Sequence, residues 1–130
     1  MERVTVDTVT LDHLLRDNRA FDVIKIDIEG AEMAAFSGMS SVIERSHNLS
    51  ISMEFTPGMY QKTGLDPQDF LRKMLKLGFI FWEIDKRNGG IVCLNQNDVT
   101  NLCDKPQSNL LLDRYGNSES LIQPLVIQRK

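Results

Sequence analysis

The sequence predicts an α/β fold with a mixed sheet, in which parallel strands come first and antiparallel strands follow. The first observation is a short, mostly β-branched apolar run, Val23 to Ile28, which ends in an acidic, glycine-containing turn and leads into an alanine-rich helical stretch. A continuous apolar run of this kind suits a parallel strand that is covered on both faces. The second observation is the alternation of strand and helix patterns along the chain. The third is Asn88-Gly89-Gly90 between two later apolar runs, which is a hairpin signal.

Length and composition indicate one soluble, globular domain. The chain has 130 residues, 42% hydrophobic and 25% charged, which is enough to bury a core. Its net charge of -3 gives no basic surface for nucleic acid, and no apolar run approaches the ~20 residues that span a membrane. Cys93 and Cys103 lack CxxC spacing, and the N-terminus lacks the features of a signal peptide. We therefore expect a cytoplasmic protein with reduced cysteines.

The first half of the chain predicts two strands and two helices. Valines alternating with threonines predict a strand from Val4 to Val9, and Thr10 is a suitable N-cap for a short helix. The apolar run predicts the next strand, from about Phe21 to Ile28. A single helix is then expected from Ala31 to Arg45, because its apolar residues fall on one stripe. Gly38 interrupts that stripe, and we expect it to let the helix approach a neighbouring backbone closely.

The second half continues the alternation. Leu49 to Phe55 alternates apolar and polar residues and predicts a strand, which Thr56-Pro57-Gly58 ends. Asp66 followed by proline predicts the start of a helix that stops at Gly78. Shorter apolar runs predict strands at 79–84, 91–94 and 109–113, with a helical turn at 98–103. These elements place one domain at residues 1–115. The tail at 116–130 is either an appendage or a partner-binding segment.

Carboxylates gather at the end of the strand that begins near Phe21. Side chains alternate along a strand, so Lys25, Asp27 and Glu29 share one side, and Glu54 ends the neighbouring, parallel strand. A helical crossover returns strands in the same direction, so Asp27, Glu29 and Glu54 should meet at one edge of the sheet. There they could hydrogen-bond a ligand, bind Mg²⁺, or take a proton from a substrate hydroxyl. The structural alternative is that Glu29 and Glu32 cap the following helix and Glu54 pairs with Lys25.

Other catalytic signatures are missing from the sequence. It contains no GxSxG, HExxH, P-loop or GxGxxG pattern, and the only adjacent glycines lie in the predicted hairpin turn. No histidine completes a metal ligand set beside the acids, so we assign no metal ligands.

The string IKIDIEGAEMAAFSGM, preceded by VTLDHLL and followed by ISMEFTP, resembles the C-terminal half of FkbM-type methyltransferases. The later segments DPQDFLRKMLKLGF and Ser108 to Leu112 are similar to that family as well. The resemblance covers about residues 4–114. Its KIDIEGAE core is fairly specific, because other α/β enzymes rarely combine such a strand with such an acidic turn.

The resemblance implies a class I, Rossmann-like methyltransferase fold, a three-layer sandwich that uses S-adenosylmethionine. Such enzymes usually methylate a hydroxyl oxygen of a sugar, a polyketide or another small metabolite. By the resemblance, Asp27, Glu29 and Glu54 are the candidate catalytic residues, with Glu54 on the acceptor side. Asp27 and Gly30 are the candidate cofactor-binding residues.

The sequence also departs from the family. The first two strands and the glycine-rich loop that cradles the cofactor have no counterpart in these 130 residues. We therefore expect the chain alone to be inactive. We also expect one edge of the 23–28 strand to lack the neighbouring strand that it has in the full fold. An unpaired apolar edge is prone to association. We predict that it is covered by the 4–9 strand, by a second copy of the chain, or by a missing N-terminal half.

Two alternatives to a methyltransferase stay open. One is a non-catalytic α/β domain that binds a partner or a small ligand. The other is a Mg²⁺-dependent hydrolase that uses Asp27 and Glu54.

Overall fold

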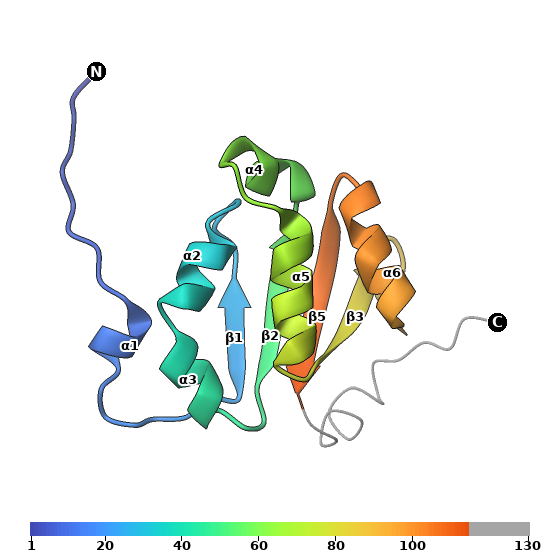
Figure 1. The fold of residues 1–130 in the computed structure, drawn as a ribbon, viewed down its shortest axis with the longest axis horizontal. Coiled ribbons are helices and arrows are strands. Elements are labelled where there is room, and N and C mark those ends of the chain that lie inside the picture. The colour runs from blue at the N-terminus through green and yellow to red at the C-terminus, as the bar shows by residue number, and fades with distance from the viewer. Residues whose placement is uncertain (115–130) are drawn as a thin grey trace.

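A computed structural model describes residues 1–114 and shows one five-stranded mixed sheet with helices packed against it (Figure 1). The strands, in their order across the sheet, are β1 (Val23–Ile26), β2 (Ser50–Phe55), β5 (Ser108–Arg114), β3 (Phe79–Asp85) and β4 (Gly90–Cys93). β1 and β2 are parallel, and every other pair is antiparallel. The predicted α/β class and mixed sheet are therefore confirmed.

The helices of the described residues cover one face of this sheet, except the first, which lies to the outer side of the others, and the fourth, which lies beyond the ends of β1 and β2 (Figure 1). They are α1 (Leu11–Leu14), α2 (Glu32–Ser37), α3 (Ser40–Arg45), α4 (Pro57–Lys62), α5 (Pro67–Lys76) and α6 (Gln96–Asn101), followed by the 3-10 turn Leu102–Asp104. None of them is long and apolar enough to cross a membrane, within the part of the chain that the structure describes.

Burial across one row of the sheet shows which face is covered. Ile51, Leu112 and Phe81 lie side by side in register toward the helices, and each is at most 1% exposed. In the next row Val23 and Ile80 point the other way and are 68% and 41% exposed, whereas Ser50 and Asp113 between them are buried. Residues 1–114 thus form two layers rather than the three layers that the family resemblance implies, because no helix among them packs on the second face.

An aromatic cluster joins the helices to the ends of the strands. The ring centroids of Phe36 and Phe70 are 5.1 Å apart, and those of Phe55 and Tyr60 are 5.3 Å apart. All four side chains are at most 3% exposed, and burial of one such ring stabilises the fold by roughly 1.5–3 kcal/mol. The cluster comes from α2, β2, α4 and α5, so it fixes the connections that follow β1 and β2.

The single helix predicted from Ala31 to Arg45 is wrong, because the structure divides it into α2 and α3. The Asp12 carboxylate accepts hydrogen bonds from the N–H groups of Ser41 and Val42, at 3.0 Å each. The Asp12 N–H in turn donates to the Gly38 carbonyl at 2.9 Å. A side chain about thirty residues away therefore starts a new helix here, which periodicity within the segment does not reveal.

The close approach predicted for Gly38 is present, but the neighbour that a Cβ atom would meet is a side chain rather than a backbone. A Cβ atom at Gly38 would lie 3.3 Å from the Thr10 side chain. Thr10 is also the N-cap of α1, as predicted, since its hydroxyl accepts from the His13 N–H at 3.1 Å.

The later elements mostly follow the prediction. The Asp66 side chain caps α5 by accepting from the Gln68 N–H at 2.9 Å, and Gly78 takes a left-handed φ of +85° after its end. β3 and β4 form the predicted hairpin. The short helix α4 was not predicted, because the proline that ends the preceding strand is also the first residue of this helix.

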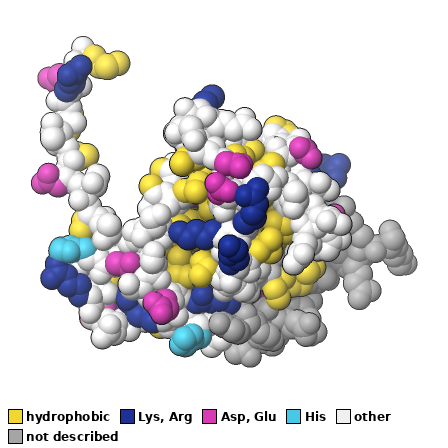
Figure 2. Space-filling model, in the orientation of Figure 1, with side chains coloured by type: hydrophobic (Ala, Val, Ile, Leu, Met, Phe, Trp, Pro, Cys, Tyr) yellow, Lys and Arg dark blue, Asp and Glu magenta, His cyan; other side chains and the backbone are white. Residues whose placement is uncertain are grey.

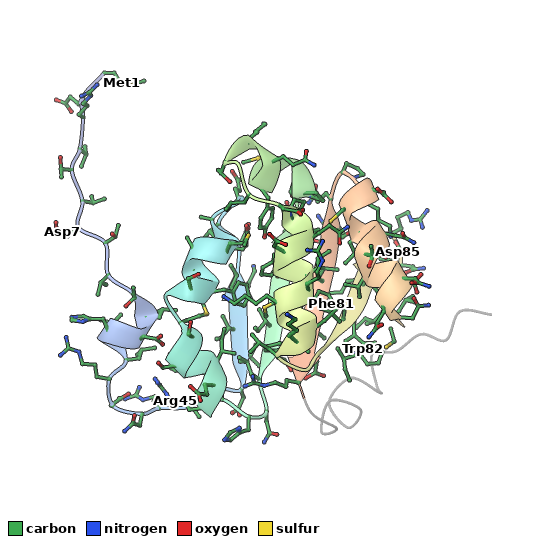
Figure 3. All side chains as sticks on the ribbon, viewed as in Figure 1. Met1, Asp7, Arg45, Phe81, Trp82 and Asp85 are labelled. Carbon is green, nitrogen blue, oxygen red and sulfur yellow. The ribbon has the colours of Figure 1, made fainter. Side chains whose placement is uncertain are left out.

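The predicted strand from Val4 to Val9 is wrong. This segment has no regular secondary structure and extends away from the rest of the protein (Figure 2). Met1 and Asp7 mark its course in Figure 3. Val4 and Val6 are 80% and 73% exposed. Strand propensity produces a strand only where a partner supplies hydrogen bonds and packing, and the segment finds none among residues 1–114.

The open edge of the sheet is consequently β1, which pairs with β2 alone among the described residues. Cover by the N-terminal segment of the same chain is therefore wrong. Cover by another chain, or by an N-terminal half, stays a prediction. The tail at 116–130 and the boundary predicted for it lie outside the described residues.

Candidate functional site

Asp27 and Glu54 line the same hollow at the carboxyl-terminal edge of β1 and β2. Ile26 and Met53 are register partners in these parallel strands, and each acid follows one of them directly. The hollow has a volume of about 260 Å³. The predicted meeting of these two acids is confirmed, and it follows from the parallel crossover through α2 and α3.

The remaining polar groups of the hollow come from neighbouring strands. Ser52 and Asn109 contribute a hydroxyl and an amide from β2 and β5, and Lys25 and Lys86 contribute amines. Such a lining provides both donors and acceptors for the hydroxyl groups of a small ligand. The two carboxylates are the groups able to accept a proton from one of them.

The structural alternative, in which Glu54 pairs with Lys25, is wrong, because the ion-pair partner of Glu54 is Lys86. The Glu54 carboxylate lies 4.0 Å from the Lys86 amine, and both side chains are substantially exposed. An exposed pair at this distance contributes little to stability, so the Glu54 carboxylate remains accessible to a ligand.

Glu29 does not join the other two acids. The regular strand ends at Ile26, and Glu29 takes a left-handed φ of +48°. Alternation along a strand holds only while the backbone is extended, so the turn moves Glu29 away from the lining of the hollow. A catalytic role for Glu29 stays a prediction without support from its position.

Gly30 is required by the packing of the turn that follows β1. Its φ is +96°, and a Cβ atom there would lie 2.8 Å from the Met59 Cβ atom in α4. Its N–H donates to Glu32 Oε1 at 3.1 Å. Both features are internal to the protein, and the role of Gly30 in cofactor binding stays a prediction.

The burial of Glu32 was not predicted from the sequence, where this acid was considered only as a possible cap of the following helix. The side chain is 2% exposed, and one of its oxygens, Oε2, is buried with no hydrogen-bond partner at standard geometry. The available signal was its spacing of four residues from Phe36, which places it on the buried stripe of α2.

Tyr60 was missed as well, because α4 was not predicted. It is fully buried, and burial together with the negative charge of Glu32 raises the pKa of Tyr60 above its ordinary value. A phenol in this setting stays protonated and is a hydrogen-bond donor.

The described residues give no support to metal or thiol chemistry. Within residues 1–114, no three or more His, Cys, Asp or Glu side chains group together as a metal site. Cys93 and Cys103 are free cysteines, and burial raises the pKa of both thiols, which disfavours a nucleophilic thiolate.

The fold and the hollow define an α/β protein that presents two carboxylates at the carboxyl ends of adjacent parallel strands, where such sheets bind ligands. A family model described as the methyltransferase FkbM domain matches residues 1–81. The match covers more than half of the chain and includes Asp27 and Glu54, so the chain belongs to the FkbM methyltransferase domain family. Comparisons with curated proteins and with solved structures found no match.

Proposed function

We propose that this chain supplies the acceptor side of an S-adenosylmethionine-dependent methyltransferase that modifies a hydroxyl oxygen of a small metabolite. One observation supports this most directly. In a chain of the FkbM methyltransferase domain family, Asp27 and Glu54 line one hollow at the carboxyl ends of two parallel strands.

The arrangement suits the chemistry of O-methyl transfer. The bound cofactor would supply an electrophilic methyl group on a positively charged sulfur. The protein then has to orient an acceptor hydroxyl in line with that methyl group and remove its proton. Glu54 would take the proton from the acceptor side of the hollow, and Asp27 would hold the hydroxyl at the end of β1. Ser52 and Asn109 would bind further polar groups of the acceptor.

The residues of this chain suit the sulfonium end of the cofactor better than its nucleoside end. Two carboxylates favour a positive sulfonium by Coulomb attraction. The usual cradle for the nucleotide part is a glycine-rich turn between a strand and a helix. The sequence has no GxGxxG pattern, and Gly89-Gly90 lie at the β3–β4 turn. We therefore propose that sequence other than these 130 residues holds the nucleoside, and that the chain alone does not turn over.

A second candidate is a non-catalytic binding domain. The observation that favours it is the edge of β1, which has no strand partner among residues 1–114 on the side away from β2. Backbone N–H and C=O groups along such an edge can receive a strand from another protein.

Calorimetry with S-adenosylmethionine and S-adenosylhomocysteine separates the two candidates. We expect no micromolar binding by the 130-residue chain, and recovery of binding when the cofactor-binding half of another FkbM-domain methyltransferase is fused before residue 1. In that chimera, Glu54→Gln should lower methyl transfer about 10²–10⁴-fold, the usual contribution of a general base, while S-adenosylhomocysteine binding is kept. Glu44→Gln, an exposed acid on α3, is the matched control and should change neither.

Three outcomes would count against the proposal. A folded chimera that binds no S-adenosylhomocysteine would refute the methyltransferase assignment and favour the binding domain. Unchanged transfer by Glu54→Gln would remove Glu54 from the chemistry. Micromolar binding by the 130-residue chain alone would support an enzyme but contradict the proposal that the nucleoside is held elsewhere.

A further inference from the structure

The turn after β1 and the helix after β2 pack directly against each other. α4 lies beyond the carboxyl ends of both strands, at the top of the view in Figure 1. The contact is close enough that Gly30 has no room for a Cβ atom beside Met59. These two connections begin where Asp27 and Glu54 lie, so whatever fixes the contact also fixes the distance between the two acids.

A buried carboxylate lies at this contact. Glu32 Oε1 accepts from the Gly30 N–H at 3.1 Å, which ties α2 to the turn. Glu32 Oε2 is buried and has no partner at standard hydrogen-bond geometry. A buried carboxylate oxygen without a partner is costly, so a donor is expected next to it.

Tyr60 provides a hydrogen-bond donor that also lacks a partner. Its hydroxyl is buried and has no partner at standard geometry either. Its ring is held in place by Phe55 and Phe70, with ring centroids 5.3 Å and 5.9 Å away. Met59, the residue before Tyr60 in α4, packs against Gly30, to which Glu32 is hydrogen-bonded, so the two side chains come from segments in contact. Burial and the negative charge of Glu32 both raise the pKa of Tyr60, in keeping with this placement. A phenol can donate one hydrogen bond, and a carboxylate oxygen can accept it.

We propose that the Tyr60 hydroxyl donates to Glu32 Oε2, and that this pair clamps the turn after β1 to α4. The clamp makes Glu32 a positioning residue for Asp27 and Glu54. One oxygen of Glu32 binds the connection that follows β1, and the other binds the helix that follows β2. The positioning role rests on the proposed function, whereas the hydrogen bond itself does not.

The test uses the 130-residue chain and two variants of Glu32. Glu32→Met removes both contacts. Glu32→Gln keeps them, because its amide oxygen can accept from Gly30 while its NH₂ group donates to the Tyr60 oxygen. We expect Glu32→Met to accelerate hydrogen exchange of the Gly30 amide at least tenfold and to displace the backbone NMR signals of Asp27 and Glu54. Glu32→Gln should restore exchange to within about threefold of wild type.

The hydrogen bond has its own spectroscopic signature. In wild type, a slowly exchanging Tyr60 hydroxyl proton should show a nuclear Overhauser effect to the Glu32 side chain, and Glu32→Met should abolish both. The control is Val42→Ala, which removes buried volume from α3 away from this contact. It should lower global stability without displacing the Asp27 and Glu54 signals.

The proposal is overturned if Val42→Ala and Glu32→Met, at matched loss of stability, give the same exchange and signal pattern. It is also overturned if wild type shows no protected Tyr60 hydroxyl proton. None of these measurements needs a cofactor or a turnover. A failed clamp therefore leaves the methyltransferase proposal standing, and a failure to bind S-adenosylhomocysteine leaves the clamp standing.

Discussion

Replacing Gly30 by alanine tests whether the turn after β1 is packed as tightly as the structure shows. The new Cβ atom meets two penalties. A left-handed backbone costs an alanine roughly 1–2 kcal/mol, and Gly30 has a φ of +96°. The Cβ atom would also lie 2.8 Å from Met59 Cβ, and relief of such overpacking costs about 1–3 kcal/mol. Gly30→Ala should therefore lower the free energy of unfolding by about 2–5 kcal/mol.

Gly64 is a matched control, because it shares the backbone conformation but not the contact. Its φ is +76°, and a Cβ atom there would meet nothing within 4 Å. Gly64→Ala should therefore cost only the backbone term, roughly 1–2 kcal/mol. Urea unfolding followed by circular dichroism and by the fluorescence of Trp82 measures both variants.

Removal of the Met59 Cβ atom separates the steric clash from the backbone cost of Gly30→Ala. Met59→Gly in the Gly30→Ala background should make the double variant about 1 kcal/mol more stable than the sum of the single changes predicts, because residues in contact are not additive. Equal losses at Gly30 and Gly64, within about 0.5 kcal/mol, together with additivity at Met59, would refute the close contact between the turn and α4.

Three further predictions concern stability. Partial burial raises the pKa of Asp12, but the hydrogen bonds from two backbone N–H groups outweigh this and lower the pKa below its ordinary value. The two N–H groups bond to different oxygens of Asp12, and an amide has only one acceptor oxygen, so Asp12→Asn should cost about 1 kcal/mol at neutral pH. The loss should vanish well below pH 3.8, the ordinary value. Urea unfolding at both pH values, with exposed Asp17→Asn as the control, checks this. Phe70→Ala should cost about 3–5 kcal/mol in the same assay, because it empties the aromatic cluster. Deletion of residues 1–6, which make no hydrogen bond to any other of residues 1–114, should leave the melting temperature unchanged by calorimetry.

Local signals in the sequence specified the elements whose partners lie nearby. Asp66 and Gly78 bound α5 as expected, since a cap and a stop act within one turn of the helix. The β3–β4 hairpin follows from its glycine turn. The meeting of Asp27 and Glu54 was also predictable, because a crossover between parallel strands brings their carboxyl ends to one edge.

The features that were predicted wrongly depend on a distant contact, on a missing partner or on a backbone turn, none of which the local residue pattern shows. Asp12 splits the helical segment after Gly30 into two helices from a position about thirty residues earlier. The Val4–Val9 segment has strand propensity but no partner, so it forms no strand. Glu29 leaves the site because the strand ends two residues before the predicted Ile28, and the backbone then turns left-handed.

The class of fold, the family resemblance and the pair of acids at the strand ends could be predicted from the residue pattern, because each depends on short motifs and on the handedness of one crossover. The packing of the whole chain was needed to show that Glu32 and Tyr60 are both buried and that the turn after β1 packs against α4. Burial and atomic contact are properties of the packed chain, since they depend on what other elements bring alongside, and no pattern within a single segment encodes them.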